Sequence, residues 1–176
     1  MAALGRFLAS VEQRAYRMAR IAVRNDADAL DIVQDAMLQL ARHYAHRPGE
    51  QWPPLFHRIL QNRIRDHQRR RKVRERVLAW VPGFHSSDEN EADPVDAVAA
   101  PDKGAVETLM EDQAIQALEQ ALAHLPARQQ EAFMLRNFEG LDVAATALAM
   151  GCSEGSVKTH YSRAVHSLRA SLGTVW

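Results

Sequence analysis

The sequence predicts an all-α protein: two small helical domains joined by a flexible acidic linker, the C-terminal one with a helix-turn-helix. Three observations support this fold class. Apolar residues recur at the three- and four-residue spacing of amphipathic helices along most of the 176 residues. The sequence contains no alternating strand pattern and no Asn-Gly hairpin signal. A stretch rich in proline, glycine and acidic residues interrupts the helical pattern at residues 82–108 and is predicted to be the linker.

The distribution of charge also divides the chain. The formal net charge is zero, but residues 1–85 carry 16 basic and 8 acidic side chains. Residues 86–113 carry 1 basic and 9 acidic side chains, and residues 114–176 carry 5 of each. Such asymmetry indicates two modules with different partners and a solvated tether between them. We therefore expect domains at residues 1–81 and 109–176.

Composition narrows the cellular setting. The single cysteine, Cys152, excludes an internal disulfide and fits a reducing compartment. Arg6, Glu12 and Arg14 interrupt any apolar start, so no signal peptide is predicted. No apolar run approaches the roughly 20 residues that a membrane-spanning helix needs. A cytoplasmic protein without membrane insertion is expected.

Two helices are predicted before residue 45. The first, over residues 6–22, would bury Phe7, Val11, Ala15, Met18 and Ala22. The second would be capped by Asn25 or Asp26. Its expected core stripe is Leu30, Val33, Met37, Leu40 and Tyr44. Asp28, Asp31 and Asp35 lie in the first half of this helix, where they either complement the helix dipole or form an acidic docking face.

A third helix follows the Pro- and Gly-containing loop at residues 46–54 and starts at Leu55. Its expected buried side is Leu55, Ile59, Leu60 and Ile64. Between Arg63 and Arg76 it carries eight basic residues, with only Asp66 and Glu75 as acids. Such a run is either a solvated face or a phosphate-binding stripe, and clustering of this kind favours nucleic acid.

The C-terminal part predicts four more helices. One resumes at Leu109, with an expected stripe of Leu109, Ile115, Leu118, Leu122 and Leu125. The next starts near Pro126 and ends at Gly140. Its apolar side would be Ala132, Phe133, Leu135 and Phe138. Two short helices then join through a tight turn.

The last two helices have the features of a helix-turn-helix. Asp142 and Ser153 are good N-caps, and Gly151 lies where a left-handed C-cap is needed. The predicted buried stripe of the second helix is Val157, Tyr161, Ala164, Leu168 and Leu172. Its opposite face is polar and basic, which suits entry into a DNA major groove. A plain helical hairpin is the alternative.

Three segments resemble bacterial RNA polymerase sigma factors, in particular the extracytoplasmic-function (ECF) group of the sigma-70 family. They are GCSEGSVKTHYSRA (residues 151–164) with the preceding LPARQQEAFMLRNFEGL, DALDIVQDAML (residues 28–38), and LFHRILQN (residues 55–62) with its basic continuation. The resemblance covers nearly the whole chain apart from the linker. It implies an N-terminal domain that binds the polymerase clamp and melts the minus-ten promoter element. It also implies a C-terminal domain that binds the polymerase flap and reads the minus-thirty-five element.

The resemblance assigns roles to individual residues. The implied polymerase-binding residues are Asp31, Gln34 and Asp35. The implied minus-ten residues are Asn62, Arg65, Asp66 and Arg69, with Trp52 and Phe56 expected to offer a pocket for an unstacked base. The implied minus-thirty-five residues are Ser156, Lys158, Thr159, His160 and Arg163. Leu30 replaces a familial acid, His57 a familial tyrosine and His160 a common arginine.

Partners and cofactors follow from the same resemblance. Core RNA polymerase and promoter DNA are the implied partners, and an anti-sigma factor is expected from the family alone. No cofactor is expected, and the eight histidines show no convincing metal-ligand spacing, so no metal is expected either. No phosphate loop or catalytic motif is present, so an enzyme is not predicted. The rival hypothesis is a stand-alone helix-turn-helix regulator that binds duplex DNA without polymerase.

Overall fold

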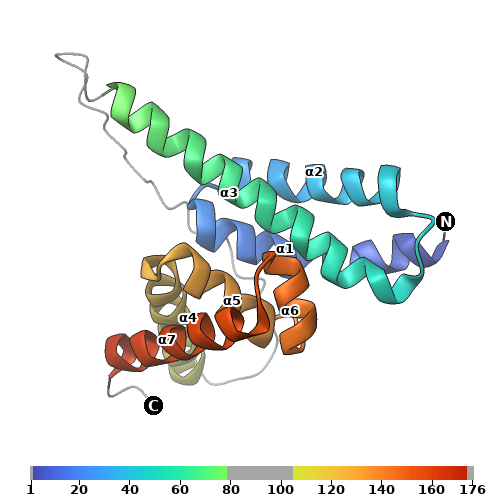
Figure 1. Cartoon of the computed structure of the whole chain (residues 1–176). Coiled ribbons are helices and arrows are strands. Elements are labelled where there is room, and N and C mark those ends of the chain that lie inside the picture. Colours follow the sequence, from blue (N-terminus) through green and yellow to red (C-terminus); the bar gives the residue numbers. More distant parts are fainter. Residues whose placement is uncertain (1, 79–104, 174–176) are drawn as a thin grey trace.

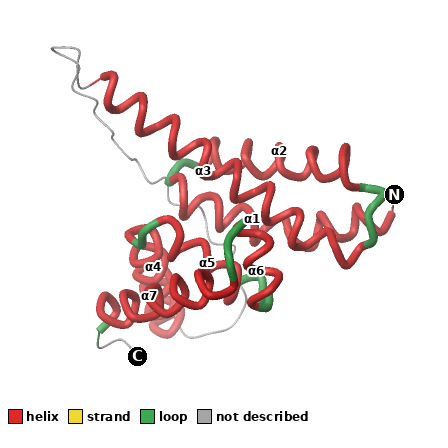
Figure 2. The backbone as a smooth tube through the Cα atoms, viewed as in Figure 1, coloured by secondary structure: helices red, strands yellow, loops and turns green. Residues whose placement is uncertain are grey.

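The structure of the protein is a computed structural model that describes residues 2–78 and 105–173. Within these ranges every regular element is a helix, which confirms the predicted all-α class (Figures 1 and 2). The elements are α1 (Ala2–Val23), α2 (Asp26–Tyr44), the short 3-10 helix η1 (Gly49–Gln51), α3 (Trp52–Leu78), α4 (Ala105–His124), α5 (Ala127–Asn137), α6 (Val143–Met150) and α7 (Glu154–Leu172). None of the described helices is long and apolar enough to cross a membrane.

Helices α1, α2 and α3 share one hydrophobic core. Its fully buried members include Ala15, Val33, Leu40, Phe56 and Leu60. Asn25 caps α2 as predicted, because its side chain accepts a hydrogen bond from the backbone of Asp28. The long helix α3 runs past the end of this bundle, and its C-terminal end stands away from the other helices (Figure 1).

The predicted stripe of α2 was wrong at one position. Leu30 is 46% exposed, whereas its neighbour Ala29 is fully buried. The buried side of α2 is Ala29, Ile32, Val33, Ala36 and Leu40. Small alanines let α2 approach its neighbours closely at this face, and the larger Leu30 is left on the solvent side, one residue round the helix.

The C-terminal helices build the predicted helix-turn-helix. Asp142 accepts from the backbone N–H of Ala145 and so caps α6, and Ser153 accepts from that of Ser156 and caps α7. Gly151 between them has φ of +65°, the left-handed conformation expected of it. Val157, Ala164 and Leu168 are buried along α7, as its spacing predicts.

The start of the C-terminal domain differs from the prediction. Helix α4 begins at Ala105, so four residues assigned to the linker are helical, and the rest of that linker lies outside the described residues. Ile115 is 50% exposed instead of buried, whereas Leu118 and Leu122 of α4, and Leu125 just after its end, pack into the C-terminal cluster. The side chain of Leu109 lies outside the described residues.

The two halves of the chain pack against each other. Helix α6 packs against α3, and α4 and α5 contact α1 (Figure 1). Met18 and Ile21 of α1 belong to the same buried cluster as Leu122, Leu135 and Met150 of the C-terminal helices. The composition predicted two tethered modules, but it gave no sign of this contact between them.

Candidate nucleic-acid and polymerase interface

One outer face of α2 carries the predicted polymerase-binding residues. Asp31, Gln34 and Asp35 are all exposed. Asp35 lies 3.4 Å from the Arg63 guanidinium of α3 in a solvent-exposed ion pair, which contributes little to stability. Leu38, one turn after Gln34, is 51% exposed. The face therefore combines carboxylates with an apolar side chain that no described element covers.

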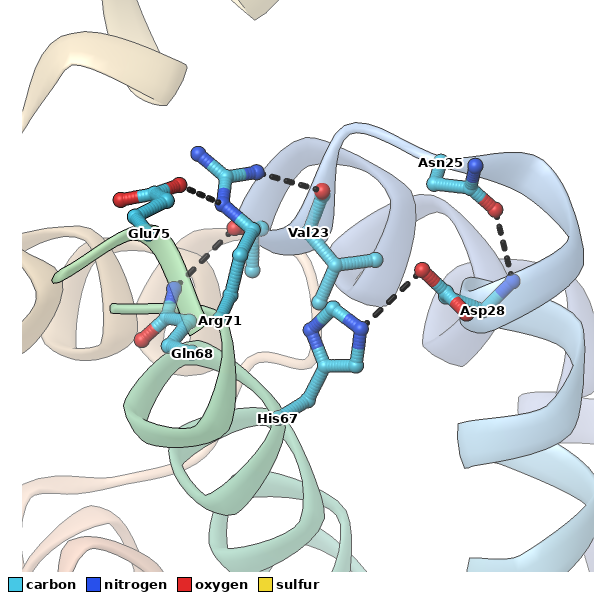
Figure 3. A network of polar contacts seen from close by, with 8 residues as sticks. Val23, Asn25, Asp28, His67, Gln68, Arg71 and Glu75 are labelled. Atoms are coloured by element: carbon cyan, nitrogen blue, oxygen red, sulfur yellow. Dashed lines mark hydrogen bonds and ion pairs between the residues drawn. The ribbon is translucent and has the colours of Figure 1, made fainter. Parts of the chain in front are cut away.

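The basic half of α3 is held to the corner between α1 and α2 by a polar network (Figure 3). Gln68 donates to the carbonyl of Ala22 at 3.0 Å, and Arg71 donates to that of Val23 at 3.4 Å. His67 lies 3.0 Å from Asp28, and Arg71 also pairs with Glu75. These contacts fix the rotation of α3 about its axis, so they decide which arginines face outward.

Other exposed arginines alternate along α3 with the residues of that network. Arg69, Arg70 and Arg74 line an open groove together with Val73 and Val77. Earlier on the helix, Arg65 donates to Asn62 at 2.7 Å, and Asn62 and Asp66 are exposed. The predicted minus-ten residues of α3 thus run along the helix into its projecting, positively charged end.

The two aromatic residues of the predicted base pocket differ in position. The indole N–H of Trp52 donates to the carbonyl of Tyr44 at 3.2 Å, and the ring is partly exposed 5.9 Å from that of Phe7. Phe56 is fully buried in the N-terminal core, packed edge-on against Phe7 and His57. A ring without exposed surface cannot stack on a base, so we correct its assignment and treat Phe56 as a core residue.

The residues predicted to read duplex DNA are accessible on α7. Lys158, Thr159 and Arg163 are exposed, and Ser156 and His160 are partly exposed. Aromatic contacts join α7 to α5. The ring of Tyr161 stacks on that of Phe133, with 6.1 Å between the ring centroids, and the guanidinium of Arg136 lies 5.9 Å from the centroid of the Tyr161 ring. Arg136 also bonds to the carbonyl of Leu141. The sequence prediction missed Arg136, although its place just before the helix-turn-helix marks it as a support.

An ion pair between the partly exposed Arg128 and the buried Glu131 supports the turn of the helix-turn-helix. Arg128 donates to Glu131 and to the carbonyl of Met150, both at 2.9 Å. The second hydrogen bond gives a partner to a carbonyl at the C-terminal end of α6, where no backbone donor follows within the helix. Glu131 is 3% exposed. Burial raises the pKa of its carboxyl, and the hydrogen bond from Arg128 and the charges of Arg65 and Arg128 only partly offset this. Burial likewise raises the pKa of the Cys152 thiol nearby, which fits a packing role.

We expect Glu131→Gln to stabilise the protein at neutral pH. A carboxyl whose pKa is higher in the folded state than its ordinary 4.5 stabilises the fold at pH values below 4.5. This stabilisation is lost as the pH rises through the pKa of the folded state. A neutral amide of the same shape avoids that loss and still accepts from Arg128. Urea unfolding should show a gain in stability at pH 7 and none at pH 4. An equal change at both pH values would contradict this account.

Comparison with known proteins bears on both domains. Residues 5–74 match the profile described as "Sigma-70 region 2", and residues 115–168 match "Sigma-70, region 4". The chain is 32% identical over 160 residues to the ECF RNA polymerase sigma factor SigM of Mycobacterium tuberculosis, covering 90% of this chain and 71% of SigM. The chain belongs to the ECF sigma factors. It is also 30% identical over 171 residues to the ECF sigma factor BldN of Streptomyces coelicolor, covering 94% of this chain and 59% of BldN.

Solved structures agree with this sigma factor's fold. The sigma factor RpoE of Bartonella quintana, solved with the anti-sigma factor NepR, superposes with a TM-score of 0.71 at 23% identity over 97% of this chain and 96% of that one. CnrH, solved with the cytosolic domain of CnrY, gives a TM-score of 0.60 at 21% identity over 96% of this chain and 86% of that one. The family membership confirms the resemblance drawn from the sequence.

Proposed function

We propose that this sigma factor binds core RNA polymerase through the acidic face of α2 and opens promoters with α3. The observation that carries the proposal is the separation of charge between these adjacent helices. Asp31, Gln34 and Asp35 face solvent on α2, whereas Arg69 and its neighbours face solvent on the projecting end of α3. A negative face suits a basic protein partner, and a positive helix suits a DNA backbone.

The minus-ten site in this proposal consists of Asn62, Arg65, Asp66 and Arg69, with Trp52 at its edge. Arginines hold the backbone of the separated strand, while polar side chains and the indole contact its unstacked bases. Phe56 is left out because it belongs to the core.

The minus-thirty-five site lies on α7. Ser156, Lys158, Thr159, His160 and Arg163 would enter the major groove, with α6 crossing the backbone. His160 stands where arginine is common in the family. A neutral imidazole cannot make the two parallel hydrogen bonds that arginine makes to guanine, so an altered upstream preference is expected.

The remaining roles follow from polymerase binding. The C-terminal domain would dock on the polymerase flap, and an anti-sigma protein would compete for the same faces. RpoE, which shares this fold, was solved with the anti-sigma factor NepR, and CnrH was solved with the cytosolic domain of CnrY. The protein would act in the cytoplasm with polymerase and the chromosome, as a dissociable subunit and not as a catalyst.

The deciding experiment is gel filtration of the purified chain with bacterial core polymerase, followed by transcription from a small promoter library. Co-elution and promoter-specific transcripts are expected. Failure to co-elute, together with tight duplex binding by the chain alone, would instead favour the stand-alone regulator. A palindromic site would accompany that outcome, because a symmetric dimer reads two half-sites.

A further inference from the structure

Apolar side chains hold only the first half of α3 in place. Phe56, Leu60 and Ile64 follow one another at intervals of four residues, and all three are buried in the N-terminal core. None of the described side chains that follow Ile64 on α3 is buried. The part of the helix that carries Arg65 and Arg69 therefore depends on polar contacts for its orientation.

Gln68 continues the buried side of α3 with a polar side chain. It lies four residues after Ile64, so it occupies the next position of the same stripe. Its side-chain nitrogen, Nε2, donates to the carbonyl oxygen of Ala22 at 3.0 Å, and this contact is partly buried. The stripe thus changes from apolar packing to hydrogen bonding at the point where α3 leaves the core.

Two neighbouring side chains of α3 add to this contact (Figure 3). The Nε2 atom of His67 lies 3.0 Å from a carboxylate oxygen of Asp28, in the first turn of α2. Arg71 donates to the carbonyl of Val23 at 3.4 Å. We call His67, Gln68 and Arg71 the α3 anchor. The α3 anchor joins α3 to the end of α1 and to the start of α2.

The end of α1 has carbonyl groups that need these donors, because the last four carbonyls of a helix have no partner within it. Arg24 follows α1 with a φ of +59°, a left-handed conformation that is uncommon outside glycine, and its N–H bonds to the carbonyl of Arg20. The later carbonyls of Ala22 and Val23 accept from α3 instead. Donors suit this position, since the C-terminal end of a helix carries partial negative charge.

The predicted minus-ten residues lie on a different side of α3. Asn62 and Asp66 are four residues apart, as are Arg65 and Arg69, so the four share a face directed away from the α3 anchor. At an outer radius of about 5–6 Å, a helix rotation of about 30° displaces a side chain by about 3 Å. That displacement equals the length of a hydrogen bond. A helix free to rotate would therefore lose the contacts of both arginines.

We propose that Gln68 is a positioning residue for promoter opening, which fixes the rotation of α3 so that Arg65 and Arg69 meet the separated strand. The effect on DNA rests on the proposed function, whereas the effect on the orientation of α3 does not. Gln68 acts without touching DNA, because its amide donor already has a protein partner. It contributes more than Arg71, whose bond is longer and which also pairs with Glu75.

The orientation of α3 can be measured in the full chain without polymerase. Double electron–electron resonance would use spin labels on Ser10→Cys and Val73→Cys, both at exposed positions, with the native thiol removed by Cys152→Ala. Gln68→Met removes the donor but keeps the length and helix propensity of the side chain. It should broaden the distribution of distances between the labels. Gln68→Lys should not, because an ammonium group can donate to Ala22.

An unchanged distribution for Gln68→Met would overturn the proposal. Should Gln68→Met lose its helical circular dichroism, Arg71→Met decides instead. The side chain of Arg71 is half-exposed, so its replacement spares the core. The same broadening is expected from Arg71→Met, and its absence would count against the α3 anchor.

Promoter opening tests the consequence for DNA. Gln68→Met should reduce permanganate reactivity of the minus-ten element about 10-fold, while core binding stays within a factor of about two. Gln68→Lys should retain at least about half of the wild-type opening. The matched control is Gln13→Met, which makes the same chemical change at an exposed position of α1. An equal loss from Gln13→Met, or no rescue by Gln68→Lys, would contradict the positioning role.

A double-mutant cycle separates positioning from an independent contact with DNA. Residues that act through one another have non-additive effects. Gln68→Met should therefore reduce opening about 10-fold in the wild-type chain but no more than about threefold in a chain that carries Arg69→Ala. An equal effect in both chains would overturn the positioning role. If the wild-type chain itself does not bind core polymerase, the proposed function fails, while the label distances still decide the orientation of α3.

Discussion

The double replacement Arg65→Ala with Arg69→Ala is expected to reduce promoter opening about 100-fold while core binding stays within a factor of about two. Both guanidinium groups lie along α3, and neither is part of the α2 face. Loss of two backbone or base contacts should act on strand separation, where the single strand must be held. Permanganate reactivity of unpaired thymines in the minus-ten element measures opening, and gel filtration measures core binding.

A charge-matched control separates this effect from loss of positive charge in general. Arg6 and Arg169 are exposed and lie on α1 and α7, and Arg6→Ala with Arg169→Ala should leave opening nearly unchanged. Arg65 also donates to the carbonyl of Gln61 and lies near Glu131. Arg69→Ala alone therefore shows the effect at a position free of those contacts. Equal loss of core binding in the double variant would contradict the division of labour.

The local elements of this fold were predictable because their chemistry is local. Asn25, Asp142 and Ser153 cap helices through hydrogen bonds to backbone N–H groups three residues away. Gly151 adopts a conformation that other residues avoid. Each of these features is determined by a few consecutive residues. The same holds for the polar face of α7, whose members follow from helical spacing alone.

Contacts between the halves were not predictable in this way. Nothing in the spacing of Met18 or Ile21 shows that they pack against Leu122 and Met150, because that depends on how two separate domains meet. In the sequence, His57 and Glu139 look like ordinary polar residues, although both side chains are buried between the halves. The sequence predicts Phe56 in a base pocket because aromatic residues near a basic helix often stack on bases. In the structure its ring is instead buried in the core of α1–α3.

Reversal of charge at Asp31 and Asp35 to arginine is expected to weaken core binding at least about 100-fold. Like charges brought together at an interface cost several kcal/mol, which is more than the loss of an attraction. The fold should survive, since both carboxylates are exposed and the Asp35–Arg63 pair is a solvated one. Helical circular dichroism checks the fold, and gel filtration with core polymerase measures binding.

The control for this reversal is Glu12→Arg with Glu50→Arg, which adds the same charge at exposed sites outside α2. It should leave core binding unchanged, whereas the α2 variant should retain binding of a minus-thirty-five duplex by α7. Equal losses in both double variants would mean that net charge, and not the face of α2, governs polymerase binding. Loss confined to Asp31 and Asp35 would localise the docking face to the outer side of α2, next to the exposed Leu38.

The apolar side chain of Leu38 adds contact area beside the two carboxylates. Leu38→Ala should therefore weaken core binding further in the same direction.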